Sequence, residues 1–254
     1  MKTRIIALAN QKGGSGKTTT TVNLGAALAQ RKKKVLLIDL DPQAHASLHL
    51  GISPDNPVNS VYEVIQGEIR AEDAAVGILK NLDLIPADVH LAGAEEYLHN
   101  KPGRESYLKE AIKPLMGRYD YILIDCPPSL GLLTQNALTA AQEVFIALQS
   151  QYLALAGSGQ LLEVVELVKE RINPALEITG IISCMYDKRT NLSREVLGEL
   201  KKHFKGIVFK ISIRVNVALA EAPIRGQDIF RYEPRSHGAR DYKSLAREVI
   251  KQEV

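Results

Sequence analysis

The sequence predicts an α/β protein whose mostly parallel, twisted sheet carries helices on both faces. Strand-like and helix-like segments alternate along almost the whole chain of 254 residues, which is the order that parallel sheets require. The strand-like segments are continuous apolar runs, and such runs are typical of strands covered on both faces. No linker, repeat or low-complexity segment interrupts the alternation, so we expect a single domain over residues 1–254.

The predicted strands are short apolar runs that end in turn residues or aspartates. In chain order they span residues 5–8, 35–38, 82–86, 121–124, 144–148, 178–185 and 207–211. The predicted helices have apolar residues at helical spacing, and glycine or proline marks several of their ends. They span residues 21–30, 61–66, 91–99, 105–116, 155–171, 192–204 and 239–251. A loop with two prolines, residues 53–59, precedes the second helix.

A glycine-rich segment joins the first strand to the first helix. Residues 12–19 are Lys-Gly-Gly-Ser-Gly-Lys-Thr-Thr. Glycines in this context let backbone N–H groups point into one concavity, and the helix N-terminus adds a positive dipole, so the segment predicts a phosphate-binding loop. Lys17 would reach the β- and γ-phosphates, and the Thr18 hydroxyl would bind Mg²⁺. A glycine-rich loop with two solvated lysines is the alternative.

The loop departs from the usual G-x-x-x-x-G-K-[ST] pattern, because Gln11 stands at the first glycine and a second lysine, Lys12, follows it. In this it resembles the deviant Walker A motif of the ParA/MinD family of ATPases. The resemblance implies a P-loop NTPase fold, ATP and Mg²⁺ as cofactors, and a Lys12 that crosses a dimer interface to the partner's nucleotide. The implied ATP-binding residues are Lys12, Gly13, Gly14, Ser15, Gly16, Lys17, Thr18, Thr19 and Asn216.

Three aspartates follow predicted strands, and ligands of open parallel sheets bind where the strands end. Asp125 follows residues 121–124, the position of a Walker B carboxylate that holds Mg²⁺ through water. Asp39 and Asp41 follow residues 35–38. By the family resemblance Asp41 belongs to switch I and orients the attacking water, which makes Lys12, Lys17 and Asp41 the catalytic candidates. Asp39 would be a Mg²⁺ neighbour. The alternatives are a turn or cap aspartate at 125 and an Asp-Pro turn at 41.

Residues 125–134, Asp-Cys-Pro-Pro-Ser-Leu-Gly-Leu-Leu-Thr, resemble switch II of the same family. Cys126 and Cys184 are the two cysteines. They form neither a disulfide framework nor a C-x-x-C pattern, so a reducing compartment is expected. Cys126 fits best as a small packed hydrophobe. A nitrogenase-reductase-like electron carrier, which needs two cysteines of each subunit at an interface cluster, remains an alternative.

Positive charge is concentrated in the last quarter of the chain. Residues 186–254 carry 15 Lys and Arg against 9 Asp and Glu. Such an excess favours a surface for a polyanion, although basic residues that merely solvate helices would give the same count. The family resemblance assigns a DNA contact to Arg189, whereas Arg214 is displaced by one position from a family arginine. The candidate DNA-binding residues are Arg189, Arg214, Lys188, Arg225 and Arg235.

Together these features resemble the small chromosomal, Soj-like ParA proteins. The resemblance implies an ATP-dependent sandwich dimer that binds DNA nonspecifically and is released when a ParB-like partner stimulates hydrolysis. Few residues precede the loop, so no N-terminal operator-binding domain is expected. A related ATPase that positions another cargo, or acts at the membrane as MinD does, is the main alternative. Residues 246–254 have too little apolar face for a membrane anchor, no apolar run spans a bilayer and no signal peptide precedes the first strand, so a cytoplasmic location is expected.

Overall fold

One sheet of seven strands forms the centre of the computed structural model, which describes residues 3–55, 59–149 and 159–252. The strand order is β3-β4-β2-β5-β1-β6-β7, and only the β3–β4 pair is antiparallel. The strands are β1 (Arg4–Ala9), β2 (Val35–Asp39), β3 (Val76–Leu79), β4 (Leu82–Ile85), β5 (Tyr121–Asp125), β6 (Glu143–Gln149) and β7 (Glu177–Cys184). The predicted single α/β domain with a mostly parallel sheet is confirmed.

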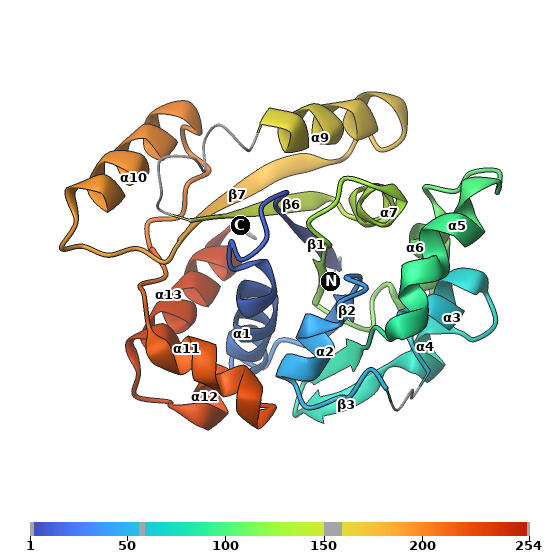
Figure 1. Ribbon diagram of the computed structural model, residues 1–254, viewed down its shortest axis with the longest axis horizontal. Coiled ribbons are helices and arrows are strands. Elements are labelled where there is room, and N and C mark those ends of the chain that lie inside the picture. Colours follow the sequence, from blue (N-terminus) through green and yellow to red (C-terminus); the bar gives the residue numbers. More distant parts are fainter. Residues whose placement is uncertain (1–2, 56–58, 150–158, 253–254) are drawn as a thin grey trace.

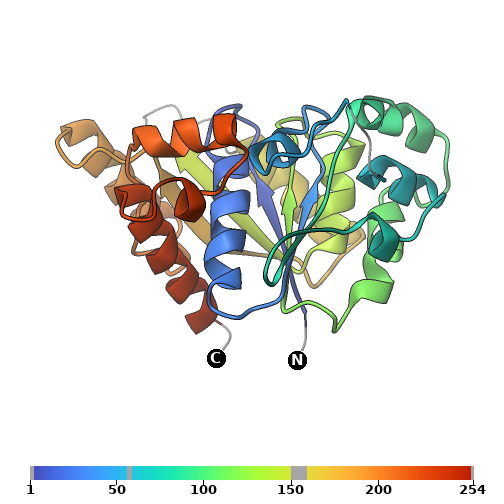
Figure 2. The same ribbon diagram turned by 90° about the horizontal axis from the view of Figure 1, so that it is seen from below.

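Helices cover both faces of this sheet (Figures 1 and 2). The described α-helices are α1 (Lys17–Ala29), α2 (His45–His49), α3 (Val61–Gln66), α4 (Ala71–Ala74), α5 (Ala94–His99), α6 (Tyr107–Ile112), α7 (Leu132–Ala140), α9 (Gly159–Arg171), α10 (Asn191–His203), α11 (Val217–Glu221), α12 (Ile229–Tyr232) and α13 (His237–Lys251). Short 3₁₀ helices are η1 (Val89–Gly93), η2 (Lys113–Leu115) and η3 (Ala222–Arg225). Figure 1 shows α9 and α10 on one side of β7, with α1 and α13 on the other.

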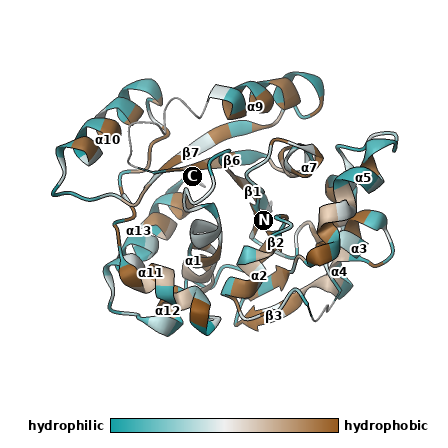
Figure 3. Cartoon of the chain, viewed as in Figure 1, coloured by the Kyte–Doolittle hydropathy of each residue, from teal (hydrophilic) through white to brown (hydrophobic). Residues whose placement is uncertain are grey.

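The alternation of side chains along each strand divides the core into two layers. Ile6 and Leu8 of β1 point to the layer that contains residues of α1, α12 and α13. Ile5 and Ala7 point to the opposite layer, which contains residues of α3, α5, α6, α7, α9 and α10. Because both faces of β1 are covered, apolar residues are needed at every position, which explains the continuous apolar run. Figure 3 shows hydrophobic and hydrophilic residues alternating along outer helices such as α9 and α10, as expected where only one side of a helix faces the sheet.

Six of the seven predicted strands are present with bounds shifted by at most one residue. The prediction over residues 207–211 is wrong, because this segment joins the sheet only through a bridge between Val208 and Ile181. The backbone N–H groups of Lys210 and Ile211 instead donate to the carboxylate of Glu248 on α13, at 2.8 and 3.0 Å. These two N–H groups therefore do not pair with β7, although Phe209 N and Ile213 N on either side of them donate to Ile181 O and Ser183 O of β7. The sequence also missed β3, a short and half-buried edge strand.

Most predicted helices are present, with altered bounds. The helix over residues 61–66 is confirmed, with a capping box of Ser60 and Glu63 and a left-handed Gly67 after it. The segments 91–99 and 105–116 each divide into an α-helix and a 3₁₀ helix, the second at Pro114. The start of the predicted helix 155–171 lies outside the described residues. The short helices α2, α4, α11 and α12 were not predicted. In the described part of the chain no helix is long and apolar enough to cross a bilayer.

Candidate nucleotide site

The glycine-rich loop leaves β1 and enters α1 at the carboxyl end of the central strands. Gly14 and Gly16 have positive φ angles of 68° and 97°, a conformation that favours glycine. A Cβ on Gly16 would also lie 3.2 Å from the sulfur of Cys184. The loop is braced against β6, because Asn10 donates to Ala147 O at 2.5 Å and Gln149 donates to Gly14 O at 2.6 Å. Sequence reasoning missed both bracing side chains.

Lys17 is the first residue of α1, and its side chain turns back over the loop. The residue is only 6% exposed, and its Nζ donates to Lys12 O at 3.3 Å. Burial lowers the pKa of Lys17, and the neighbouring carboxyl groups of Asp125 and Asp41 oppose this. A buried ammonium beside backbone N–H groups is the arrangement that binds phosphate oxygens.

Asp39 and Asp125 face each other across neighbouring strands, as direct partners in the β2–β5 register. Both are fully buried. Burial, and then the charge of Asp39, raises the pKa of Asp125 to about 8, while Thr18, Lys17 and Thr21 oppose the rise. Asp125 Oδ1 accepts from Thr21 Oγ1 at 3.1 Å, whereas its Oδ2 is buried without a hydrogen-bond partner among the described residues. A carboxylate oxygen in this situation fits a cation or its bound water.

Asp39 is held by a residue that sequence reasoning missed. Its Oδ2 accepts from both the backbone N and the hydroxyl of Ser47 in α2, at 2.8 and 2.7 Å. Burial raises the pKa of Asp39 to about 6 despite these hydrogen bonds. The helix begins after Ala44, which has a positive φ angle of 51°. Asp39 therefore anchors the switch I segment to the sheet in addition to lying beside Asp125.

Asp41 and the loop line a common cleft of about 960 Å³. Asp41 is 7% exposed, and its Oδ1 accepts from Gln43 N at 2.9 Å. The cleft also contains Thr18 and the glycines predicted to bind ATP. It meets a second pocket of about 350 Å³, and the two share Gly16, Thr19 and Met185. The smaller pocket is lined by Asn216, whose buried Oδ1 has no partner in the described part of the chain.

The structure places residues 13–19, Asp41 and Asn216 on the walls of these two adjoining pockets, and it buries Asp39 and Asp125 at the ends of two neighbouring strands. The larger pocket contains the glycine-rich loop and Asp41, and the smaller pocket combines apolar side chains with the amide of Asn216. Lys12, at the start of the loop, is exposed. The assignment of each residue to ATP or Mg²⁺ remains a prediction.

The two arginines placed first for DNA binding are both engaged in ion pairs. Arg214 binds Asp241 through two nitrogens, with Nη2–Oδ1 at 2.5 Å and Nε–Oδ2 at 2.9 Å, and the Asp241 side chain is 2% exposed. Arg189 is 83% exposed and pairs with Asp187 at 2.7 Å, and this guanidinium lowers the pKa of Asp187 to about 2. A backbone bridge between Tyr186 and Arg214 makes their two segments neighbours.

The remaining DNA candidates, Lys188, Arg225 and Arg235, are exposed. Arg225 lines the nucleotide cleft, whereas Arg189 does not. The five candidates are therefore not one patch of free cations, and their contact with DNA remains a prediction.

The two cysteines lie at different places near this end of the sheet. Cys126 follows β5, and Cys184 ends β7 beside the P-loop and Thr20. Burial raises the pKa of both thiols, that of Cys184 to about 12. Each is buried and neutral at physiological pH, as expected for packed small hydrophobes.

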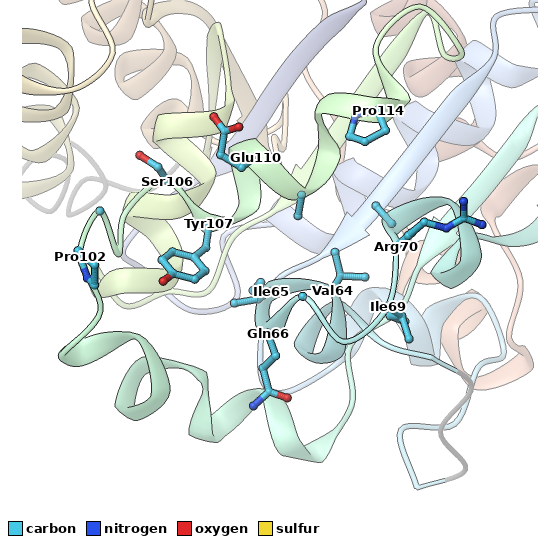
Figure 4. A pocket seen from close by; sticks show the side chains of 14 residues that line it. Val64, Ile65, Gln66, Ile69, Arg70, Pro102, Ser106, Tyr107, Glu110 and Pro114 are labelled. Atoms are coloured by element: carbon cyan, nitrogen blue, oxygen red, sulfur yellow. The ribbon is translucent and has the colours of Figure 1, made fainter.

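A separate pocket of about 550 Å³ lies between α3, α4 and α6. Figure 4 shows Val64, Ile65, Ile69 and Tyr107 among the side chains on its walls. It contains none of the residues of the glycine-rich loop and none of the three aspartates. The phosphate-binding groups therefore distinguish the first cleft as the nucleotide site.

A glycine loop with a buried lysine, and two carboxylates at the ends of adjacent parallel strands, define a P-loop ATPase. Residues 3–178 match the family model described as an AAA domain. The chain is 49% identical to the sporulation initiation inhibitor protein Soj of Bacillus subtilis, over 97% of this chain and 98% of that protein. It is 44% identical to the chromosome partitioning protein ParA of Myxococcus xanthus, over 99% and 89%. The chain belongs to this Soj/ParA family of the AAA-domain ATPases.

Among solved structures, the chain is similar to cobyrinic acid a,c-diamide synthase from Mycobacterium smegmatis with a bound ATP analogue and magnesium. The TM-score is 0.87 and the identity 40%, with 98% of this chain and 95% of that chain covered. The ATP analogue and magnesium bound to that protein agree with the ATP and Mg²⁺ expected from the loop of this chain.

Proposed function

We propose that this chain is a ParA-type ATPase that segregates chromosomal or plasmid DNA with a ParB-like activator. The observation that carries the proposal is the nucleotide end itself, where Lys17, Asp39 and Asp125 are buried together and a second lysine, Lys12, stands exposed at the loop entrance. The family membership supports the partition role.

The residues of the site divide the work of ATP hydrolysis. Lys17 and the loop N–H groups bind the phosphate oxygens, and Thr18 with Asp125 would hold Mg²⁺, beside Asp39. When bound, Mg²⁺ supplies charge neutralisation on the β- and γ-phosphates. Asp41, in the same cleft, orients the attacking water and accepts its proton. Its hydrogen bond to Gln43 N holds the carboxylate in place.

Exposed apolar side chains around the cleft favour a sandwich dimer. Val217 is 69% exposed and Ile224 81% exposed, and Leu48, Met185 and Val215 are exposed as well. All five line the two pockets of the nucleotide site. Apolar patches of this kind mark protein–protein contacts. A second copy seated on this face would bury them and bring Lys12 to the nucleotide of its partner.

In the proposed cycle the ATP-bound dimer binds DNA without sequence preference through its basic residues, in the cytoplasm and on the nucleoid. A dimer doubles the positive surface, so ATP strengthens binding, and salt weakens it through release of counterions. The ParB-like partner stimulates hydrolysis, and the dimer and its DNA then separate.

A related ATPase that positions another cargo or acts at the membrane is the second candidate. The apolar side of α13 does not favour a membrane anchor, because Tyr242, Leu245, Ala246 and Val249 are buried in the core layer that also contains α1 residues. A synthase reaction, as named for the Mycobacterium smegmatis protein, would need an acceptor substrate. Measuring phosphate release in the absence of any acceptor substrate distinguishes the two reactions, because only hydrolysis proceeds with ATP and water alone.

Sedimentation of wild type, Lys12→Ala and Lys80→Ala with Mg-ATP tests the proposal. Lys80 lies exposed in the turn between β3 and β4, away from the cleft, and serves as the matched lysine control. Wild type and Lys80→Ala should dimerise with ATP, while Lys12→Ala should bind ATP and stay monomeric. Normal ATP-dependent dimers in Lys12→Ala would make this lysine an ordinary loop residue, and monomers in all three proteins would refute the sandwich dimer.

A further inference from the structure

The first turn of α7 is held by a residue from another helix. The α7 helix begins at Leu132, within the residues 125–134 that resemble switch II, and its N-cap residue is Gly131, which has no side chain with which to cap it. The carboxylate of Glu95 on α5 lies there instead, and its Oε1 accepts from Leu133 N at 3.5 Å. A negative charge at a helix N-terminus is favourable because it meets free N–H groups and the positive end of the dipole.

Glu95 approaches so closely that a side chain at residue 131 would have to displace its carboxylate. A Cβ at Gly131 would clash with Glu95 Oε1, and it would lie 2.8 Å from the carboxyl carbon and 2.9 Å from Oε2. The backbone of Gly131, with φ −75° and ψ −164°, is open to any L-residue. The neighbouring carboxylate, rather than the backbone conformation, is therefore what favours glycine at this position.

A second contact ties α7 to the same side of the molecule. Asn136, in the middle of α7, is fully buried, accepts from Leu108 N at 3.1 Å and donates to Arg104 O at 2.8 Å. This contact fixes the body of α7 against α6. Glu95 is half-buried and acts at the other end, where switch II becomes helix. The two contacts differ in that Glu95 reaches Gly131 and Leu133 from another helix, whereas Asn136 reaches Leu132 O only from within α7.

We propose that Glu95 is a positioning residue for ATP hydrolysis, which holds Gly131 and the first turn of α7 against α5 and thereby fixes the course of switch II between Asp125 and Leu132. The inference rests on the proposed ATPase function. Glu95 itself does not line the nucleotide cleft, so it acts through the segment that it holds. It links α5 to the segment that begins at the Asp125 carboxylate.

Paired substitutions test this arrangement. Gly131→Ala should push the Glu95 carboxylate aside, loosen switch II and lower kcat about tenfold, since small displacements at a reacting centre are costly. ATP affinity, which depends on Lys17 and the loop, should change less than about twofold.

Adding Glu95→Ala to Gly131→Ala should restore kcat to the value of Glu95→Ala alone, because the alanine at residue 131 then has no carboxylate to displace. Glu95→Gln, which keeps an oxygen acceptor, should lose less activity than Glu95→Ala. Glu96→Ala, an exposed acidic neighbour on α5, is the control.

Hydrogen exchange of the peptide over residues 126–133 gives a readout that does not depend on activity. Gly131→Ala should exchange several-fold faster there than wild type, and the double variant should match Glu95→Ala. A double variant that loses as much as the two single variants together would overturn the proposal, as would equal kcat and exchange in Gly131→Ala and wild type. Absence of hydrolysis in wild type would instead refute the proposed function. The exchange measurement would still show whether Glu95 holds Gly131 and the first turn of α7.

Discussion

The nucleotide end and the basic C-terminal segment differ in how their charges are arranged. At the nucleotide end Lys17, Asp39 and Asp125 are buried within one cluster, and Asp125 Oδ2 has no partner among the described residues. In the C-terminal segment Arg214 and Arg189 are already paired, with Asp241 and Asp187. A ligand at the nucleotide end can supply the hydrogen bond or cation contact that Asp125 Oδ2 does not have. A ligand of the basic segment must instead compete with the carboxylates that already pair with the two arginines.

This difference predicts two kinds of binding. Buried charges interact strongly and are little affected by salt, because ions of the solvent do not reach them. Exposed arginines already paired with carboxylates gain less from a phosphate, and what they gain falls with salt. Nucleotide affinity should thus depend strongly on single residues, whereas DNA affinity should be the sum of many weak contacts.

Lys17→Ala should have the largest effect. The substitution removes the buried ammonium of the phosphate-binding loop and leaves Asp125 without a neighbouring positive charge. ATP affinity should fall by about 100-fold or more. Titration calorimetry with Mg-ATP measures this, with Lys80→Ala as the control, and unchanged affinity in Lys17→Ala would refute the site.

Burial at the nucleotide end should also appear as a pH dependence of stability. His49 lines the cleft, and burial lowers its pKa from 6.5 to about 4, while Asp228 and a backbone hydrogen bond at Gln227 oppose this. Between these pH values the unfolded chain binds a proton that the folded chain does not. The free energy of unfolding should therefore decrease as pH falls from about 6.5 to 4, by up to about 3 kcal/mol from this group.

His49→Gln should remove that part of the decrease in urea unfolding measured at several pH values. His203→Gln, at an exposed position at the end of α10, is the control and should follow wild type. If His49→Gln and wild type lose the same stability over this range, the buried histidine makes no contribution to acid sensitivity.

In the basic segment, Arg214 and Arg189 should respond differently to alanine substitution. Arg214→Ala leaves the buried Asp241 carboxylate unpaired, so the free energy of unfolding should fall by about 2 kcal/mol. Arg189→Ala removes an exposed pair and should leave stability unchanged while it weakens DNA binding. Thermal unfolding and DNA binding at two salt concentrations measure both, and a loss of DNA affinity without loss of stability in Arg214→Ala would make it a free DNA contact.

The sequence could predict that the aspartates lie near the loop, because all of them stand where parallel strands end. Parallel strands place their carboxyl ends at one edge of the sheet, and the pairing of β2 with β5 makes Asp39 and Asp125 direct neighbours there. Composition, by contrast, counts charges and says nothing of their partners. Arg214 pairs with Asp241, which lies 27 positions later on α13. This ion pair forms only when α13 packs against the rest of the protein, so no local sequence pattern predicts it.

The errors in the fold have the same origin. The apolar segment 207–211 matches a strand locally, but Glu248 of α13 takes its backbone N–H groups. Ser47 on Asp39 and Glu95 against Gly131 were likewise missed. Each is a tertiary contact between separate elements. Of these contacts, only the one at Gly131 has a sign in the sequence, because a glycine can indicate a closely packed neighbour. The glycine does not identify that neighbour as Glu95.

The lifetime of the Asp41→Ala dimer on DNA tests the central claim, that ATP, dimer and DNA favour the same state. This variant keeps Lys17, Thr18 and the loop, so it should bind Mg-ATP and dimerise, while hydrolysis slows by about 100-fold. After free ATP is removed, the dimer and its DNA complex should both outlast those of wild type and of the exposed control Asp55→Ala, because blocked hydrolysis holds all three together. Hydrolysis at the wild-type rate, or a trapped dimer that leaves DNA as fast as wild type, would contradict the account.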